Sequence, residues 1–154
     1  LFTALKIERN VMFIILSLII LIAAFNIISG LTILVKNKTR DIAILKSIGV
    51  QNSSIAKIFF IVGLTIGAVA TFVGIILGII LSINIESIRS LISDLFNISL
   101  FSEEIYFLSK MPTEIEPFSI FLISLFSIFI TCLVSIYPAI KASKLDTIKS
   151  LKYE

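Results

Sequence analysis

The chain has 154 residues, of which 58% are hydrophobic and 15% are charged, and its formal net charge is +3. An ordinary soluble domain is about half apolar and about a quarter charged, so this composition excludes that class. The chain has no histidine and a single cysteine, Cys132. These counts exclude the usual His/Cys metal site and any Ser–His or Cys–His catalysis.

Three long apolar stretches carry no charged residue: 11–35, 58–83 and 118–140. Each exceeds the roughly 20 residues that a helix needs to cross a bilayer. We therefore predict an all-α membrane protein with three transmembrane helices. Because no acidic residue lies in these stretches, an intramembrane aspartyl protease and a carboxylate proton relay are also excluded.

The first span contains one amide side chain, Asn26. An amide without a hydrogen-bond partner is costly at membrane depth. We therefore expect Asn26 to face another helix. Its role there is either to hold helices together or to contact a substrate.

A basic segment, 36–57, joins the first two spans and carries a net charge of +4. Each of its charges would cost about 3 kcal/mol at the centre of a bilayer, so the segment must lie outside the membrane. It also holds a cluster of apolar residues, Ile42, Ile44, Leu45 and Ile48. This combination predicts an amphipathic helix that offers a docking surface to a cytoplasmic partner; a helix lying on anionic lipid is the alternative.

Boundary signals place this short helix within the segment. Thr39 is the predicted N-cap, and Asp41 lies in the first turn, where the helix dipole favours a negative charge. Gly49 is the predicted stop, because glycine readily adopts the left-handed conformation that ends many helices.

The second span carries five small residues on one face. At 100° per residue they fall within an arc of about 80°. They are Gly63, Gly67, Ala70, Gly74 and Gly78. Small residues at this spacing let a second helix approach closely. We predict a helix-packing face, whose partner is either a second subunit or another helix of the same chain.

Residues 84–117 carry a net charge of −4. They begin with an amphipathic pattern that continues the second helix, and they include a predicted short strand at 104–112. The third span carries hydroxyl groups on one face, at Ser124, Ser127, Thr131 and Ser135, and we expect these groups to form interhelical hydrogen bonds. The C-terminal stretch 139–154 is a predicted short amphipathic helix.

The charge distribution predicts the orientation. Positively charged loops stay in the cytoplasm, which places 36–57 and the tail 141–154 inside and 84–117 outside. The N-terminus then lies outside, with charged residues just before the first span. Because such an N-terminus is rarely exported unaided, we expect an upstream span and a periplasmic domain to precede this C-terminal membrane domain.

Several pieces of the chain resemble the C-terminal membrane domain of the lipoprotein-releasing ABC transporter permeases, the LolC/LolE type, within a wider group that includes MacB and FtsX. The likeness covers nearly the whole chain. Its pieces are Ala24–Ser29, Lys38–Gly49, Ile66–Gly78, Tyr106–Pro112, Tyr137–Ala139 and Leu151–Glu154. Two positions depart from the family pattern: Ala70 stands where glycine is usual, and Thr147 where proline is frequent.

The resemblance implies a non-enzymatic permease subunit of the bacterial inner membrane that extracts lipoproteins for delivery to the outer membrane. The subunit would bind no cofactor, because nucleotide binds to a partner, a cytoplasmic ABC ATPase dimer. Further expected partners are a second permease subunit, the lipoprotein cargo, a periplasmic carrier and membrane lipids, and no nucleic acid is expected.

The resemblance also implies roles for particular residues. In the family the first cytoplasmic loop is a coupling helix that rests on the ATPase. Its counterparts here are Arg40, Asp41, Ile44, Leu45, Lys46, Ile48 and Gly49. Acyl chains of the cargo are expected to contact the outer half of the first span, at Ile15 and Ile19.

Two other functions remain open. One is an export or mechanotransmission permease of the MacB or FtsX kind. The other, from a different class, is a small-solute carrier or pore, which is disfavoured because the spans lack charged residues and broken helices.

Overall fold

The computed structural model describes residues 1–96 and 113–152. Within these two ranges the chain forms six helices and no strand. The predicted strand at 104–112 lies outside the described residues.

Three of the helices are long and apolar enough to cross a membrane: α1 (Phe2–Asn37), α3 (Asn52–Ile83) and α5 (Pro117–Ser143). Each contains one predicted span and extends beyond it at one or both ends. With 36 residues, α1 is about 54 Å long at a rise of 1.5 Å per residue. The prediction of an all-α membrane protein with three transmembrane helices is confirmed.

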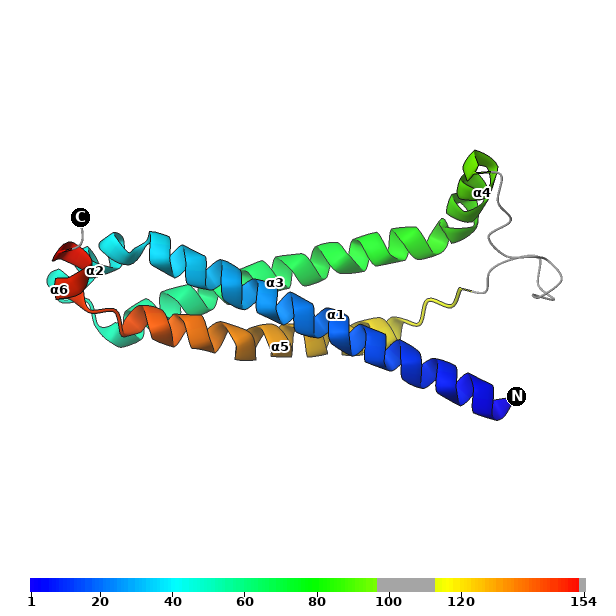
Figure 1. The fold of residues 1–154 in the computed structure, drawn as a ribbon, viewed down its shortest axis with the longest axis horizontal. Helices are drawn as coiled ribbons and strands as arrows, with labels where there is room; N and C mark the ends of the chain where they lie inside the picture. The colour runs from blue at the N-terminus through cyan, green and yellow to red at the C-terminus, as the bar shows by residue number, and fades with distance from the viewer. Residues whose placement is uncertain (97–112, 153–154) are drawn as a thin grey trace. The chain divides into compact units, whose positions relative to one another are not determined.

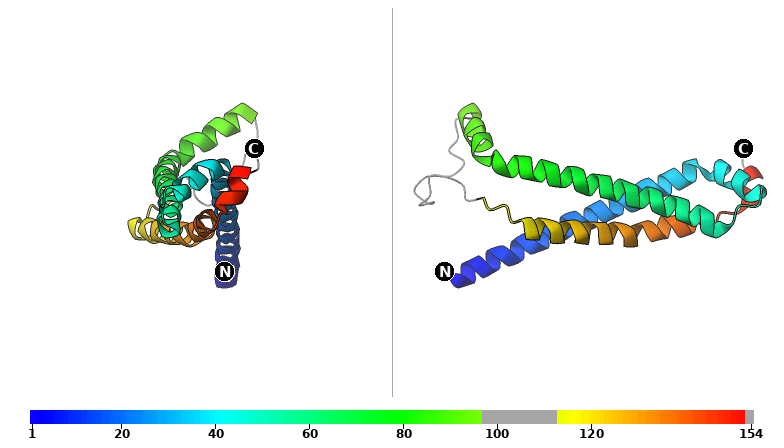
Figure 2. Two further views of the ribbon diagram at one scale, coloured as in Figure 1. Left: turned by 90° about the vertical axis from the view of Figure 1, so that its left-hand side faces the viewer. Right: turned by 180° about the vertical axis from the view of Figure 1, so that it is seen from behind.

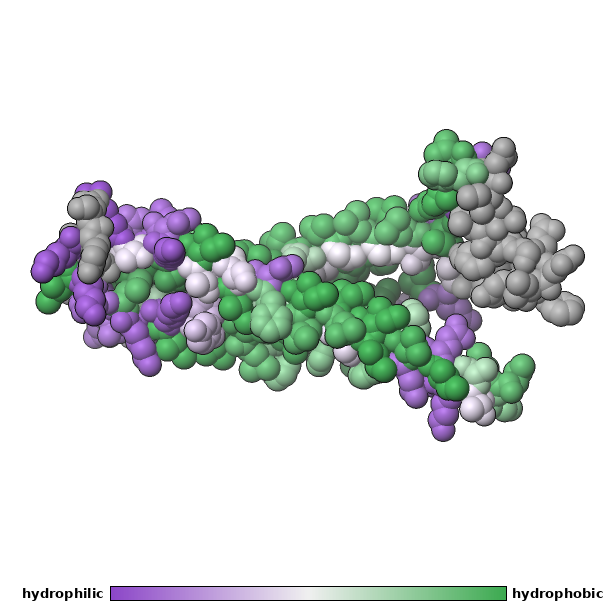
Figure 3. Space-filling model, viewed as in Figure 1, coloured by the Kyte–Doolittle hydropathy of each residue, from purple (hydrophilic) through white to green (hydrophobic). Residues whose placement is uncertain are grey.

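Large apolar side chains cover the outer surfaces of these helices. Phe13, Phe72 and Phe129 are 71%, 65% and 57% exposed. Water would disfavour so much exposed apolar surface, whereas lipid tails accept it. Figure 3 shows hydrophobic residues along α1 and hydrophilic ones gathered over the end that holds the short helices α2 (Thr39–Ser47) and α6 (Thr147–Lys152).

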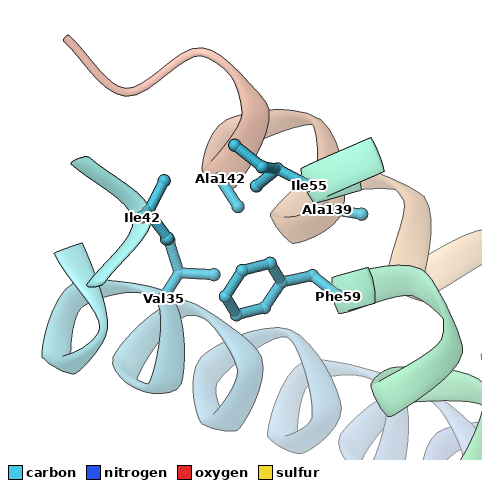
Figure 4. Packing of buried hydrophobic residues seen from close by; sticks show 6 residues of the cluster. All are labelled: Val35, Ile42, Ile55, Phe59, Ala139 and Ala142. Carbon is cyan, nitrogen blue, oxygen red and sulfur yellow. The ribbon is translucent and has the colours of Figure 1, made fainter. Parts of the chain in front are cut away.

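The chain divides into two compact units. The first unit comprises 1–69 and 125–154, and Figure 2 shows α2 and α6 at one end of its long helices. Its hydrophobic core lies at this end and is seen from close by in Figure 4. We call this core the end cluster; it consists of Val35, Ile42, Ile55, Phe59, Ala139 and Ala142. Since α1, α2, α3 and α5 each contribute at least one member, the cluster holds four helices together.

The second unit comprises 70–124 and contains the rest of α3 and the helix α4 (Ile85–Phe96). Asn84 alone separates the two helices, and its N–H donates to the carbonyl of Ile80 at 3.1 Å. Figure 1 shows α4 turned away from the axis of α3. The apolar residues of α4 fall within an arc of about 140° at 100° per residue, so the predicted amphipathic helix is present. It does not continue the second helix, because α3 ends at Ile83 and α4 is a separate helix.

Candidate coupling site

The site is built around α2, which follows α1 after a single residue, Lys38. The side chain of Lys38 forms an exposed ion pair with Asp41 at 3.1 Å. Asp41 lies in the first turn of α2, as predicted. Thr39 does not cap α2, and that prediction was wrong. Its hydroxyl donates to the carbonyl of Lys36 at 2.7 Å and so satisfies the last turn of α1 instead.

Gly49 ends α2 in the way that the sequence predicts. Its φ angle is +96°, a region that side chains disfavour. The N–H of Gly49 donates to the carbonyl of Lys46, and the N–H of Val50 donates to the carbonyl of Leu45, both at 3.1 Å. This pair of hydrogen bonds is a Schellman motif, which turns the chain from α2 toward α3.

The two faces of α2 differ in burial. Ile42 and Ala43 are each 2% exposed and pack inside the chain, whereas Ile44 is 47% and Ile48 is 74% exposed. Ile44 and Ile48 are four residues apart, so they are neighbours on one face, and the exposed Arg40 lies one further turn back. We call Arg40, Ile44 and Ile48 the docking ridge.

Leu45 is half-buried and lies beside this ridge. Leu45 therefore offers less apolar surface to a partner than the docking ridge does. The sequence identifies the apolar residues of α2, and the structure separates the buried Ile42 from the exposed Ile44 and Ile48.

Lys46 points back into the chain. Its ammonium group donates to the carbonyl of Ser143 at 2.6 Å and to the carbonyl of Leu145 at 2.7 Å. Ser143 is the last residue of α5, and the final carbonyls of a helix have no backbone N–H partner within it. The sequence suggests Lys46 as a docking residue, but the structure gives it contacts within the chain. No sequence pattern indicates this contact, because 97 residues separate Lys46 from Ser143.

The short helix α6 packs against α2. Asp146 lies just before it and accepts a hydrogen bond from the N–H of Ile148 at 3.1 Å, which is N-capping geometry. The predicted helix in the tail is therefore present. Its contact with α2 extends the site from the first loop to the end of the chain.

Farther along α3, two buried glycines mark a close contact between α3 and its neighbouring helices. A Cβ added at Gly63 would lie 2.8 Å from Leu31 Cδ1 in α1, and one added at Gly67 would lie 2.8 Å from Thr131 Cβ in α5. Both distances are shorter than carbon atoms tolerate. We call this contact the glycine seam, because it lets α3 approach the Thr131–Ser135 stretch of α5 within the same chain.

The remaining small residues of the predicted face have other surroundings. Ala70, Gly74 and Gly78 are exposed. An added Cβ at Gly74 or Gly78 would meet no described atom within 4 Å. The five residues share one arc of α3, but only Gly63 and Gly67 are buried.

Three of the four hydroxyl groups on this face of α5 do not form the expected interhelical hydrogen bonds. Ser124 donates to the carbonyl of Ile120 at 2.6 Å, and Thr131 donates to the carbonyl of Ser127 at 3.0 Å, both within α5. A serine or threonine hydroxyl can donate to the backbone carbonyl four residues earlier in the same helix. Here this carbonyl takes the place of the expected partner on another helix. The hydroxyl of Ser135 is buried and has no hydrogen-bond partner among the described residues.

Three residues predicted from the first span lie on the surface. Asn26 is exposed, so neither α3 nor α5 covers it. Ile15 and Ile19 are 45% and 55% exposed. These three side chains therefore lie on the surface of the described part of the chain.

A family model described as FtsX-like permease C-terminal matches residues 13–147. The chain therefore belongs to the FtsX-like permease family. It is 36% identical over its whole length to the lipoprotein-releasing system transmembrane protein LolC of Xylella fastidiosa (strain Temecula1), and 33% identical over 99% of its length to LolC of Neisseria meningitidis. It is also 34% identical over 93% of its length to LolE of Haemophilus influenzae. The chain spans 37%, 37% and 34% of these three relatives.

Proposed function

We propose that this chain is the C-terminal membrane domain of an ABC transporter permease that releases lipoproteins from the inner membrane. The similarity to LolC along the whole chain carries this proposal. The permease itself performs no catalysis. A separate cytoplasmic ATPase dimer binds and hydrolyses the nucleotide, and a second permease subunit completes the complex.

The docking ridge is the proposed contact with the ATPase. Burial of an isoleucine side chain against a partner contributes about 1.5 to 3 kcal/mol, and Ile44 and Ile48 are adjacent on the exposed face of α2. Arg40 adds charge that orients the encounter and raises its rate more than its affinity. The end cluster supports this role, because it fixes the buried face of α2 to three long helices.

The orientation follows from the charge distribution. The basic segment 36–57 and the tail are cytoplasmic in this proposal, and 84–117 lies in the periplasm. The exposed outer half of α1, at Ile15 and Ile19, would contact the acyl chains of the cargo, which then passes to a periplasmic carrier.

Replacement of Ile44 by Asp in the full-length permease tests the docking role. We expect Ile44→Asp to abolish co-purification of the ATPase and lipoprotein release, because a carboxylate would be buried at the interface. Ile44→Leu conserves the apolar volume and serves as the matched control. Retention of both activities by Ile44→Asp would contradict a docking role for this face.

Three further measurements on the protein without the Ile44 substitution separate the alternatives. A permease that keeps its ATPase but releases no lipoprotein from vesicles would favour a MacB-like or FtsX-like function. Ion or solute flux through the purified protein in liposomes would favour a carrier or pore. Crosslinkers at Ile15 and Ile19 that capture lipid alone would place the cargo elsewhere.

A further inference from the structure

The link between α2 and α5 differs in kind from the links between α2 and its other neighbours. One residue, Lys38, joins α2 to α1, and a short turn through Gly49 joins it to α3. The chain therefore connects α2 directly to both helices. In contrast, α5 is far away in the sequence and reaches α2 only through non-covalent contacts.

Lys46 makes the hydrogen-bonded part of this contact. Its ammonium has three donors, and two of them meet the carbonyls of Ser143 and Leu145. The C-terminal end of a helix carries a partial negative charge from its unpaired carbonyls. A cation at this position therefore gains two charge-assisted hydrogen bonds and a favourable dipole interaction.

Two donors near the end of α5 bond to a carbonyl other than the two that Lys46 meets. The hydroxyl of Ser143 already donates to the carbonyl of Ile140 at 2.7 Å, within α5. The backbone N–H of Lys144 donates to that same carbonyl at 3.2 Å. Both of these bonds go to the carbonyl of Ile140, whereas Lys46 donates to the carbonyls of Ser143 and Leu145.

We infer that Lys46 is a positioning residue that holds α2 against the end of α5, so that displacement of α2 moves α5 together with α1 and α3. The inference deepens the proposed function and rests on it, because the force on α2 would come from the ATPase. Lys46 itself would not contact the ATPase. Ile42 of the end cluster also packs with Ala139 and Ala142 of α5. Loss of the Lys46 link would therefore leave docking intact and would weaken, without abolishing, the transmission of the motion to the end of α5.

A distance measurement tests the positioning role without any transport assay. Spin labels at Ser47 and Lys141, in the full-length protein with Cys132→Ala, report the separation of α2 from the last turn of α5; both sites are exposed. We expect a narrow distance distribution for Lys46 and a broad one for Lys46→Met. Lys46→Arg, which can donate to two carbonyls, should stay narrow. Lys57→Met is the matched control, since it removes an exposed cation of the same basic segment.

A second measurement tests the consequence for coupling. We expect Lys46→Met to keep the co-purified ATPase and its basal ATP hydrolysis but to release several-fold less lipoprotein per ATP hydrolysed. Should Lys46→Met express poorly, Lys46→Gln is the second variant, because its amide retains a donor without the charge.

The outcomes are distinguishable. An unchanged distance distribution in Lys46→Met would overturn the positioning role, and loss of the ATPase with an unchanged distribution would make Lys46 a docking cation. A broadened distribution with unchanged release per ATP would overturn the role in transmission. If the unsubstituted protein released no lipoprotein, the proposed function would fail, yet the distances would still decide whether Lys46 holds α2 to α5.

Discussion

The two halves of α3 use the same spacing of small residues in different surroundings. In the half that belongs to the first unit, Gly63 and Gly67 are buried, and an added Cβ at either would clash with α1 or α5. In the half that belongs to the second unit, Ala70, Gly74 and Gly78 are exposed. Helical periodicity therefore identifies a face, but it does not identify what covers each part of that face.

The difference gives the four glycines of this face two kinds of role. Gly63 and Gly67 close a seam within one chain, which fixes α3 to the helices that carry the end cluster. Gly74 and Gly78 present a smooth surface that meets no described part of the chain. A second subunit or lipid can lie against such a surface.

The largest expected effect separates these halves directly. Gly67→Leu should prevent α3 from reaching α5, because an added Cβ already lies 2.8 Å from Thr131 Cβ and closer to its methyl group. Overpacking of this kind costs about 1 to 3 kcal/mol or more. We expect a strong fall in the thermal unfolding midpoint of the purified protein in detergent.

Gly74→Leu is the matched control for that experiment. An added Cβ at Gly74 meets no described atom within 4 Å, so the unfolding midpoint should stay close to that of the unsubstituted protein. A weakened association with a second permease subunit would show that the open half is an interface between subunits. Equal losses of stability at both positions would remove the distinction between the halves.

A smaller effect is expected at the contact between Gly63 and Ser135 in the glycine seam. Gly63→Ala should destabilise the chain, because the new methyl group would press on the hydroxyl of Ser135. Ser135→Ala alone should be nearly neutral, since the buried hydroxyl has no described partner to lose. Ser135→Gly should recover part of the loss in the double variant, with a coupling energy of about 0.5 to 3 kcal/mol.

Thermal unfolding of Gly63→Ala, of Ser135→Gly and of the variant that carries both gives this coupling energy. Strictly additive effects would show that Gly63 and Ser135 do not press on each other. The experiment also distinguishes a contact between side chains from a general loss of helix stability, which would not depend on residue 135.

The sequence predicts the features that depend on local physical chemistry. The length of the uncharged stretches predicts the three spans. The rotation of 100° per residue predicts that Gly63 and Gly67 share one face, and the ability of glycine to adopt a positive φ predicts the end of α2. The sequence does not predict the partners of Lys46 or the burial of Ile42 beside the exposed Ile44, because these depend on how distant helices meet. The hydroxyl pattern of α5 was misinterpreted for a local reason, since Thr131 finds a carbonyl one turn back.

The smallest expected effect concerns Gly49, which packs against no described neighbour and does not belong to the small-residue face of α3. Gly49 has open space around an added Cβ, but its φ of +96° lies where side chains are strained. Gly49→Ala should therefore cost about 1 to 2 kcal/mol of stability through the backbone alone. Gly30 is equally open and lies inside α1, so Gly30→Ala should be neutral or stabilising, because alanine favours helix over glycine by about 1 kcal/mol. Opposite shifts of the unfolding midpoint in these two variants would show that conformation, and not space, requires glycine at the end of α2; a loss of the same size at Gly30 would refute this.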